Sequence, residues 1–224
     1  MSNPLRKYEI WLGSIYGVLQ LFLLPLIVVV IGYLLSWEEW FMNCVMFCMN
    51  FICLTAIFHR FLIEAIKTAV AQPARTLKAA FFGLLLYFGL SFLVGLLIQL
   101  IYPDYLNLND ETVSGMVTEG GVLMSVCTVL LVPVAEELLF RGILFRGIYQ
   151  RSPVTAWILS PILFSLIHIV GYIGSYELIP FLLAFVQYLP AGFCLAFAYR
   201  KADTIIAPIL IHIVINLIGL SMMG

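Results

Sequence analysis

The chain of 224 residues is 63% hydrophobic and 10% charged, and its formal net charge is −1 at pH 7. Because soluble domains are about half apolar and about a quarter charged, this composition excludes an ordinary soluble protein and indicates an integral membrane protein. The near-neutral charge gives no reason to expect nucleic acid as a partner. We expect an all-α, polytopic transmembrane helical bundle that forms a single membrane domain over residues 1–224, within the lipid bilayer.

Seven apolar segments are long enough to cross a bilayer, which takes about 20 residues of helix. The second helix is expected to continue to about residue 70 as a solvated end at the membrane surface, where charged residues share one face. The longest connection, 103–118, is polar and is interpreted either as a plain loop or as a flap over a functional site. The seven segments are 9–35, 39–58, 79–102, 120–145, 154–172, 178–199 and 204–222.

Lysine and arginine are concentrated in alternate connections between these segments. They precede the first segment, lie between the second and third, and follow the fourth and sixth, whereas the other connections are acidic. An excess of positive residues marks the cytoplasmic side of a membrane protein. The pattern therefore predicts a cytoplasmic N-terminus and, for seven spans, a C-terminus on the opposite side.

Three short polar motifs interrupt the apolar segments. They are Glu136-Glu137-x-x-x-Arg141, Phe164-x-x-x-His168 and His212-x-x-x-Asn216. Ionisable side chains inside a membrane are costly, so they indicate function. With a rise of about 1.5 Å per residue, the distances to the cationic ends place the three motifs in one middle layer. They can therefore converge if the fourth, fifth and seventh spans are neighbours.

The types of these residues suit the hydrolysis of a peptide bond. Glu136 is the candidate general base, and His168 could hold the same water in line for attack. His212 and Asn216 carry donors that could stabilise a tetrahedral oxyanion. All four are therefore candidate catalytic residues.

Two further charged residues in the first motif are expected to support the site. Glu137 and Arg141 are four residues apart in the favourable acidic-first order, which predicts an internal ion pair. Phe164, one turn before His168, is interpreted as packing.

Other hydrolytic mechanisms have weaker support in the sequence. The chain contains neither G-x-S-x-G nor H-E-x-x-H, and its five cysteines lie in apolar runs as small core residues. A carboxylate and two histidines could also hold zinc, so ligation by Glu136, His168 and His212 stays open as an alternative. We nevertheless expect no cofactor and no metal.

The three motifs together resemble the signature of the CAAX protease and bacteriocin-processing family, also called Abi proteins. The resemblance rests on EELLFR (136–141), FSLIH (164–168) and APILIHIVIN (207–216), which occur in family order. It divides the chain into N-terminal spans without a signature, 1–118, and a catalytic core, 119–224.

The resemblance implies a metal-independent, glutamate-type intramembrane endopeptidase. It implies that Glu136 and His168 activate water, that His212 and Asn216 form the oxyanion site, and that Glu137 and Arg141 support them. It also implies a conical cavity open to lipid and to the cytoplasm, with cleavage near the cytoplasmic side. The substrate would be a peptide or CAAX-like protein undergoing maturation, and the compact chain favours the bacterial branch and a bacterial cell membrane.

Two other classes of function are weighed against this one. A non-enzymatic immunity factor or regulatory scaffold in the membrane would keep its function without Glu136. A proton-coupled carrier would also place glutamate and histidine inside the membrane. However, the sequence shows no inverted repeat of the kind that many carriers have.

Overall fold

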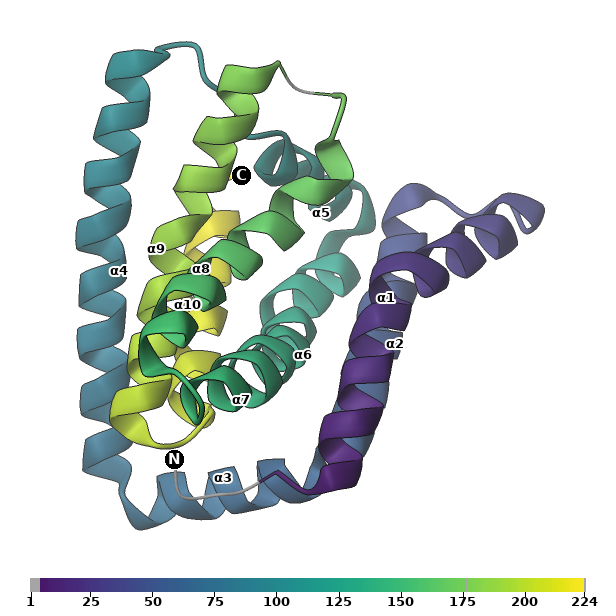
Figure 1. The fold of residues 1–224 in the computed structure, drawn as a ribbon. Helices are drawn as coiled ribbons and strands as arrows, with labels where there is room; N and C mark the ends of the chain where they lie inside the picture. The colour runs from purple at the N-terminus through teal and green to yellow at the C-terminus, as the bar shows by residue number, and fades with distance from the viewer. Residues whose placement is uncertain (1–4, 176, 224) are drawn as a thin grey trace.

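The computed structural model describes residues 5–175 and 177–223, and every regular element in these ranges is a helix (Figure 1). Short π-helical segments, Cys127–Leu131 and Leu138–Phe145, flank α6, and a 3-10 turn, Val170–Tyr172, follows α8. The α-helices are α1 (Lys7–Leu34), α2 (Glu39–Ile57), α3 (His59–Ala71), α4 (Pro73–Ile101), α5 (Leu108–Val126), α6 (Val132–Glu137), α7 (Arg146–Tyr149), α8 (Pro153–Ile169), α9 (Leu178–Ala202) and α10 (Ile206–Met223).

The expected all-α, polytopic bundle is confirmed. Within the described residues, six helical stretches are long and apolar enough to cross a membrane, and Ile206–Met222 is a shorter apolar helix in the place of the seventh expected span. The fourth expected span, 120–145, belongs to a longer helical stretch, Leu108–Tyr149. The chain is therefore an integral, multi-pass membrane protein.

The sequence predicts that the second helix continues to about residue 70, but in the structure α2 stops earlier. It ends at Ile57, and after Phe58 α3 turns away to lie across one end of the bundle (Figure 1). Phe61 is buried on the inner face of α3, whereas Glu64 and Lys67 form an exposed ion pair of 2.8 Å. An amphipathic helix of this kind is stable where one face meets apolar groups and the other meets water. The expected solvated helix is therefore present, but as a separate element.

The connection 103–118 is largely helical instead of a plain loop. The side chain of Asn107 accepts hydrogen bonds from the backbone N–H groups of Asn109 and Asp110, which caps the start of α5. The helical stretch bends at Gly121, whose φ of 55° and ψ of −134° suit a residue without a Cβ. The bend directs the first turns of α5 over the bundle instead of along the rest of the stretch.

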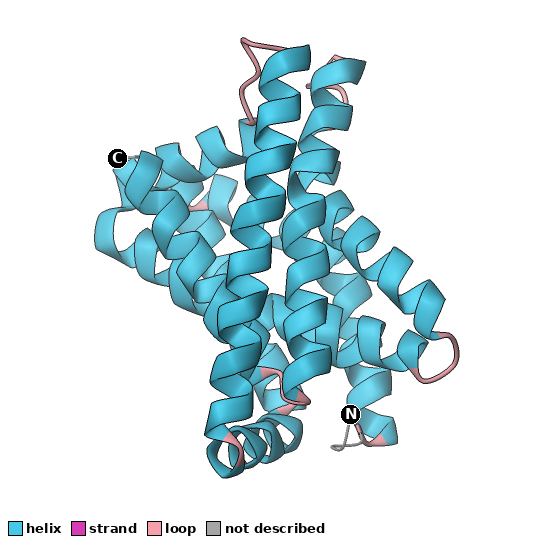
Figure 2. Cartoon of the chain, turned by 90° about the vertical axis from the view of Figure 1, so that its left-hand side faces the viewer, coloured by secondary structure: helices cyan, strands magenta, loops and turns pink. Residues whose placement is uncertain are grey.

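The helices around α9 pack closely because small residues line their contacts. Lipid is as apolar as the helices, so close van der Waals packing holds them together. The two long helices α4 and α9 lie side by side (Figure 2). At the α8–α9 contact, a Cβ on Gly192 would lie 2.5 Å from the Cα of Pro161. Glycine at position 192 therefore sets how closely these helices approach.

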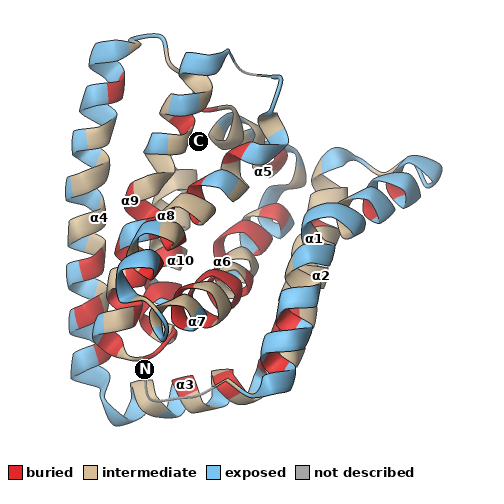
Figure 3. Ribbon diagram, in the orientation of Figure 1, coloured by how far each residue is buried: buried red, intermediate tan, exposed pale blue. Residues whose placement is uncertain are grey.

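The buried core is concentrated at the end of the bundle that carries α3 and α7 (Figure 3). Leu138, Phe145, Leu195, Tyr199 and Ile205 are each at most 1% exposed there. This core contacts the buried face of α3 through Phe61. The end of the bundle near α3 is therefore densely packed.

Candidate active site

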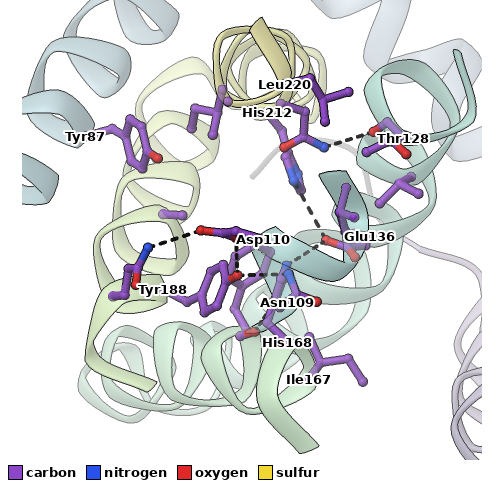
Figure 4. Close-up of a pocket in the computed structure, with 18 of the residues that line it drawn as sticks. Tyr87, Asn109, Asp110, Thr128, Glu136, Ile167, His168, Tyr188, His212 and Leu220 are labelled. Atoms are coloured by element: carbon purple, nitrogen blue, oxygen red, sulfur yellow. Dashed lines mark hydrogen bonds and ion pairs between the residues drawn. The ribbon is translucent and has the colours of Figure 1, made fainter. Parts of the chain in front are cut away.

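The three polar motifs meet at one cavity of about 320 Å³ (Figure 4). Glu136 comes from α6, His168 from the end of α8, and His212 and Asn216 from successive turns of α10. The fourth, fifth and seventh expected spans are therefore neighbours. All four candidate catalytic residues line the same cavity.

The carboxylate of Glu136 lies between two imidazole rings. Its Oε2 is 4.0 Å from Nε2 of His168 and 3.8 Å from Nε2 of His212. Both distances are too long for direct hydrogen bonds, and Oε2 is buried without a hydrogen-bond partner among the described residues. A buried oxygen of this kind requires a polar partner. The spacing suits a water molecule or a substrate oxygen between the carboxylate and the imidazoles.

His168 is held in a defined orientation and tautomer. Its Nδ1 lies 2.7 Å from the backbone carbonyl of Phe164, one turn earlier in α8. A carbonyl only accepts hydrogen bonds, so Nδ1 carries the proton and Nε2 faces Glu136 as an acceptor when the ring is neutral. The ring also stacks on Tyr188, with centroids 4.5 Å apart and planes 26° apart. His168 and Glu136 together can accept both hydrogens of one water.

His212 is oriented from the opposite side of the site. Its Nδ1 is 3.0 Å from Oε1 of Glu137, and its Nε2 points toward Glu136. Since a carboxylate accepts hydrogen bonds, Nδ1 is the protonated nitrogen of the neutral ring. His212 can therefore donate from Nε2 only as an imidazolium, whose charge Glu137 would offset.

Asn216 is fixed one helical turn beyond His212. Its Nδ2 donates to the backbone carbonyl of Thr128, 2.9 Å away in the π-helical segment before α6. An amide nitrogen carries two hydrogens, so one remains for another acceptor. The amide thus offers a donor to the cavity that Glu136 also lines.

The expected ion pair of Glu137 and Arg141 is present beneath the cavity. The two side chains are 2.9 Å apart, and both are fully buried. Arg141 also donates to the backbone carbonyl of Gly192, and its guanidinium lies 4.6 Å from the ring centre of Phe164. Neither charged residue lines the cavity. Their contacts instead suit them to hold His212 in place and to link α9 to the helical stretch that carries Arg141.

Sequence reasoning missed a second group of polar residues at the cavity. The hydroxyl of Tyr188 donates to Asp110 at 2.6 Å, and Nδ2 of Asn109 donates to that hydroxyl at 2.8 Å. Gln187 also donates to Asp110, at 3.2 Å. The signal available in the sequence was the polar pair Gln187-Tyr188 in the middle of an apolar span.

The structure gives no direct support to the zinc alternative. Among the residues that it describes, no three His, Cys, Asp or Glu side chains are grouped closely enough to hold a metal ion.

Comparison with known proteins points to one family. Residues 118–218 match the family described as Rce1-like, type II CAAX prenyl endopeptidase Rce1-like. The UPF0177 protein YxdF of Lactococcus lactis subsp. lactis (strain IL1403) is 32% identical over 90 residues, which are 40% of this chain and 44% of that protein. The match thus spans less than half the length of this curated relative. No solved structure matches the chain significantly.

Proposed function

We propose that this chain, whose residues 118–218 match the Rce1-like family of type II CAAX prenyl endopeptidases, hydrolyses a peptide bond with a water activated by Glu136. The observation that carries the proposal is the position of Glu136 between His168 and His212, at 4.0 and 3.8 Å, in a cavity of about 320 Å³. These groups are the ones that peptide hydrolysis needs at an electrophilic carbonyl.

The attacking water is held by two acceptors. One of its hydrogens points to Oε2 of Glu136 and the other to Nε2 of His168, which leaves an oxygen lone pair free. As this oxygen bonds to the carbonyl carbon, its proton passes to Glu136. The protonated Glu136 then gives that proton to the leaving nitrogen when the C–N bond breaks, so the carboxylate is regenerated.

The tetrahedral oxyanion is stabilised by donors from α10. One hydrogen of the Asn216 amide is bonded to the carbonyl of Thr128. This bond fixes the plane of the amide and therefore the direction of its second hydrogen. His212 contributes as an imidazolium that Glu137 stabilises through Nδ1. Donors fixed in advance in a site shielded from water are worth a few kcal/mol each in the transition state.

The substrate in this proposal is a peptide, or a CAAX-like protein end, that undergoes maturation. Hydrolysis requires no metal and no other cofactor. The protein resides in a bacterial cell membrane with its N-terminus in the cytoplasm, as its positive residues indicate.

Purified protein in proteoliposomes provides the test. A library of short membrane-inserting peptides is incubated with the wild type and with Glu136→Gln, which keeps the size of the side chain and removes the base. The proposal expects cleavage by the wild type alone, and it expects cleavage to persist in EDTA. Equal cleavage by both proteins would contradict the role of Glu136, and loss in EDTA restored by zinc would favour the metal alternative.

A further inference from the structure

A second cavity, of about 600 Å³, adjoins the catalytic one. It lies between the outer part of α4, the start of α5 and α9, and residues such as Gln99 and Glu111 line it. Tyr87, Asp110 and Gln187 line both cavities. The two cavities therefore share a wall formed by these three side chains, and a chain in the second cavity would lie against the wall that separates it from the cavity of Glu136.

The buried polar atoms at the second cavity that have no hydrogen-bond partner among the described residues include two from side-chain amides. One is Nδ2 of Asn107, a side chain only 7% exposed, and the other is Oε1 of Gln187. The orientation of the Asn107 amide is fixed because its Oδ1 accepts the N–H groups that cap α5. These two amide atoms are one donor and one acceptor, which match the C=O and N–H groups of an extended peptide.

The opposite side of the site is closed. Between the buried pair of Glu137 and Arg141 and the end that carries α3 and α7, the interior is filled by the core that includes Phe145, Leu195 and Tyr199, all at most 1% exposed. Arg146, 4% exposed, donates to the hydroxyl of Tyr199 in the same region. Among residues 5–175 and 177–223, no comparable cavity leads to Glu136 from the end that carries α3 and α7.

The two ends of the bundle also differ in charge. Every lysine and arginine of the described residues except Arg141 lies toward the closed end, in or beside α3, α7 and the turn between α9 and α10. The connections and helix starts at the end with the second cavity instead carry acidic residues: Glu38, Glu39, Asp104, Glu111 and Glu177. The positive-inside rule makes the closed end cytoplasmic.

We infer that an extended, positively charged peptide segment enters through the second cavity from the non-cytoplasmic face and reaches Glu136 by displacing the hydrogen bond between Gln187 and Asp110. This inference rests on the proposed function, since it names the substrate path to that site. Backbone groups of the peptide pair with Asn107 and Gln187, and its cations are attracted by Glu111 and the neighbouring acidic connections. The path differs from the cytoplasm-facing cavity that the family resemblance implies.

A labelling experiment tests the path without relying on cleavage. Ser114, which lines the second cavity, is replaced in Ser114→Cys, and Ala74, in a cavity at the cationic end, is replaced in Ala74→Cys. Each change is made in the Glu136→Gln background, and protein without either change measures labelling of the native cysteines. A membrane-impermeant maleimide is added to one face of sealed vesicles of known sidedness, with or without a leucine–lysine octapeptide.

We expect Ser114→Cys to be labelled only from the non-cytoplasmic face and to be protected by the lysine peptide. Ala74→Cys should be labelled only from the cytoplasmic face and should not be protected. A leucine–glutamate octapeptide should protect more weakly, and Glu111→Gln should raise the half-protecting concentration of the lysine peptide about twofold to fivefold.

Three results would overturn the inference: labelling of Ser114→Cys only from the cytoplasmic face, no protection by the lysine peptide, or equal protection by both peptides. The proposed function is judged separately, by cleavage with the active protein. Correct labelling and protection without any cleavage would keep the path and reject the peptidase. Cleavage together with one of the three overturning results would keep the peptidase and reject the path.

Discussion

His212 bridges the two adjacent glutamates: its Nδ1 lies 3.0 Å from Glu137, and its Nε2 lies 3.8 Å from Glu136. One imidazole thus connects the fully buried ion pair of Glu137 and Arg141 to the carboxylate in the cavity. The two glutamates are neighbours in sequence but have different surroundings, because Glu137 is fully buried whereas the side chain of Glu136 is 24% exposed. This difference suits Glu137 to support the site and Glu136 to take part in the reaction.

Loss of Arg141 should damage the fold before it affects chemistry. Arg141→Ala leaves the carboxylate of Glu137 buried beside His212 without its main cation, which costs about 3–5 kcal/mol. Thermal unfolding in detergent measures the cost. The double variant Glu137→Leu/Arg141→Met should recover much of the stability but not the cleavage, because His212 loses its acceptor. If the double variant cleaves at the wild-type rate, the bridge has no part in catalysis.

Tyr188 should act as a positioning residue for His168. Tyr188→Phe keeps the ring that stacks on His168 but removes the hydroxyl that donates to Asp110 at 2.6 Å. A lost hydrogen bond of about 0.5–1.5 kcal/mol predicts a fall in kcat of about twofold to tenfold. Tyr188→Ala, which also removes the stacking, should lower kcat further. Equal rates for the Phe and Ala variants would argue against positioning by the ring.

Asn216 should affect kcat far more than KM. Asn216→Ala removes an oxyanion donor, and such donors are worth about 100-fold to 1000-fold in kcat. Asn43→Ala is a matched control, because Asn43 also donates from a helix to a backbone carbonyl but lies outside the cavity. Steady-state kinetics in proteoliposomes measure both. A change in KM alone would place Asn216 in substrate binding instead.

Gly192→Ala should destabilise the contact of α8 with α9. The new Cβ would meet the backbone of Pro161 at 2.5 Å, and overpacking of this kind costs about 1–3 kcal/mol. Gly89→Ala in α4 is the control, because a Cβ there meets nothing within 4 Å. Unfolding midpoints should fall for Gly192→Ala alone. Equal midpoints would mean that the helices can separate without cost.

The convergence of the three motifs could be predicted because it depends on distances along single helices and on the spacing of residues within them. Helix rise fixes the depth of Glu136, His168 and His212 relative to the cationic ends, and residues four apart share a helix face. The pairing of Glu137 with Arg141 follows from the same spacing. These regularities hold wherever a span is a continuous helix.

The other half of the cavity depends on a backbone bend that periodicity does not encode. Gly121 adopts a positive φ and turns the start of α5 over the bundle, which brings Asn109 and Asp110 to Tyr188, some 80 positions later in the chain. In sequence, Asn109 and Asp110 look like ordinary residues of a polar connection. The turn into α3 at Phe58 was missed for the same reason, because a helical face pattern does not reveal the direction of the helix axis.

The most direct test of the account is the cleavage rate of Glu136→Gln against the wild type and Glu64→Gln. Glu64 lies on the exposed face of α3, so its substitution controls for the loss of one carboxylate. With all three proteins folded to the same unfolding midpoint, removal of a general base predicts a rate lower by about 100-fold to 10,000-fold for Glu136→Gln alone. A folded Glu136→Gln that cleaves at the wild-type rate would contradict the proposed mechanism.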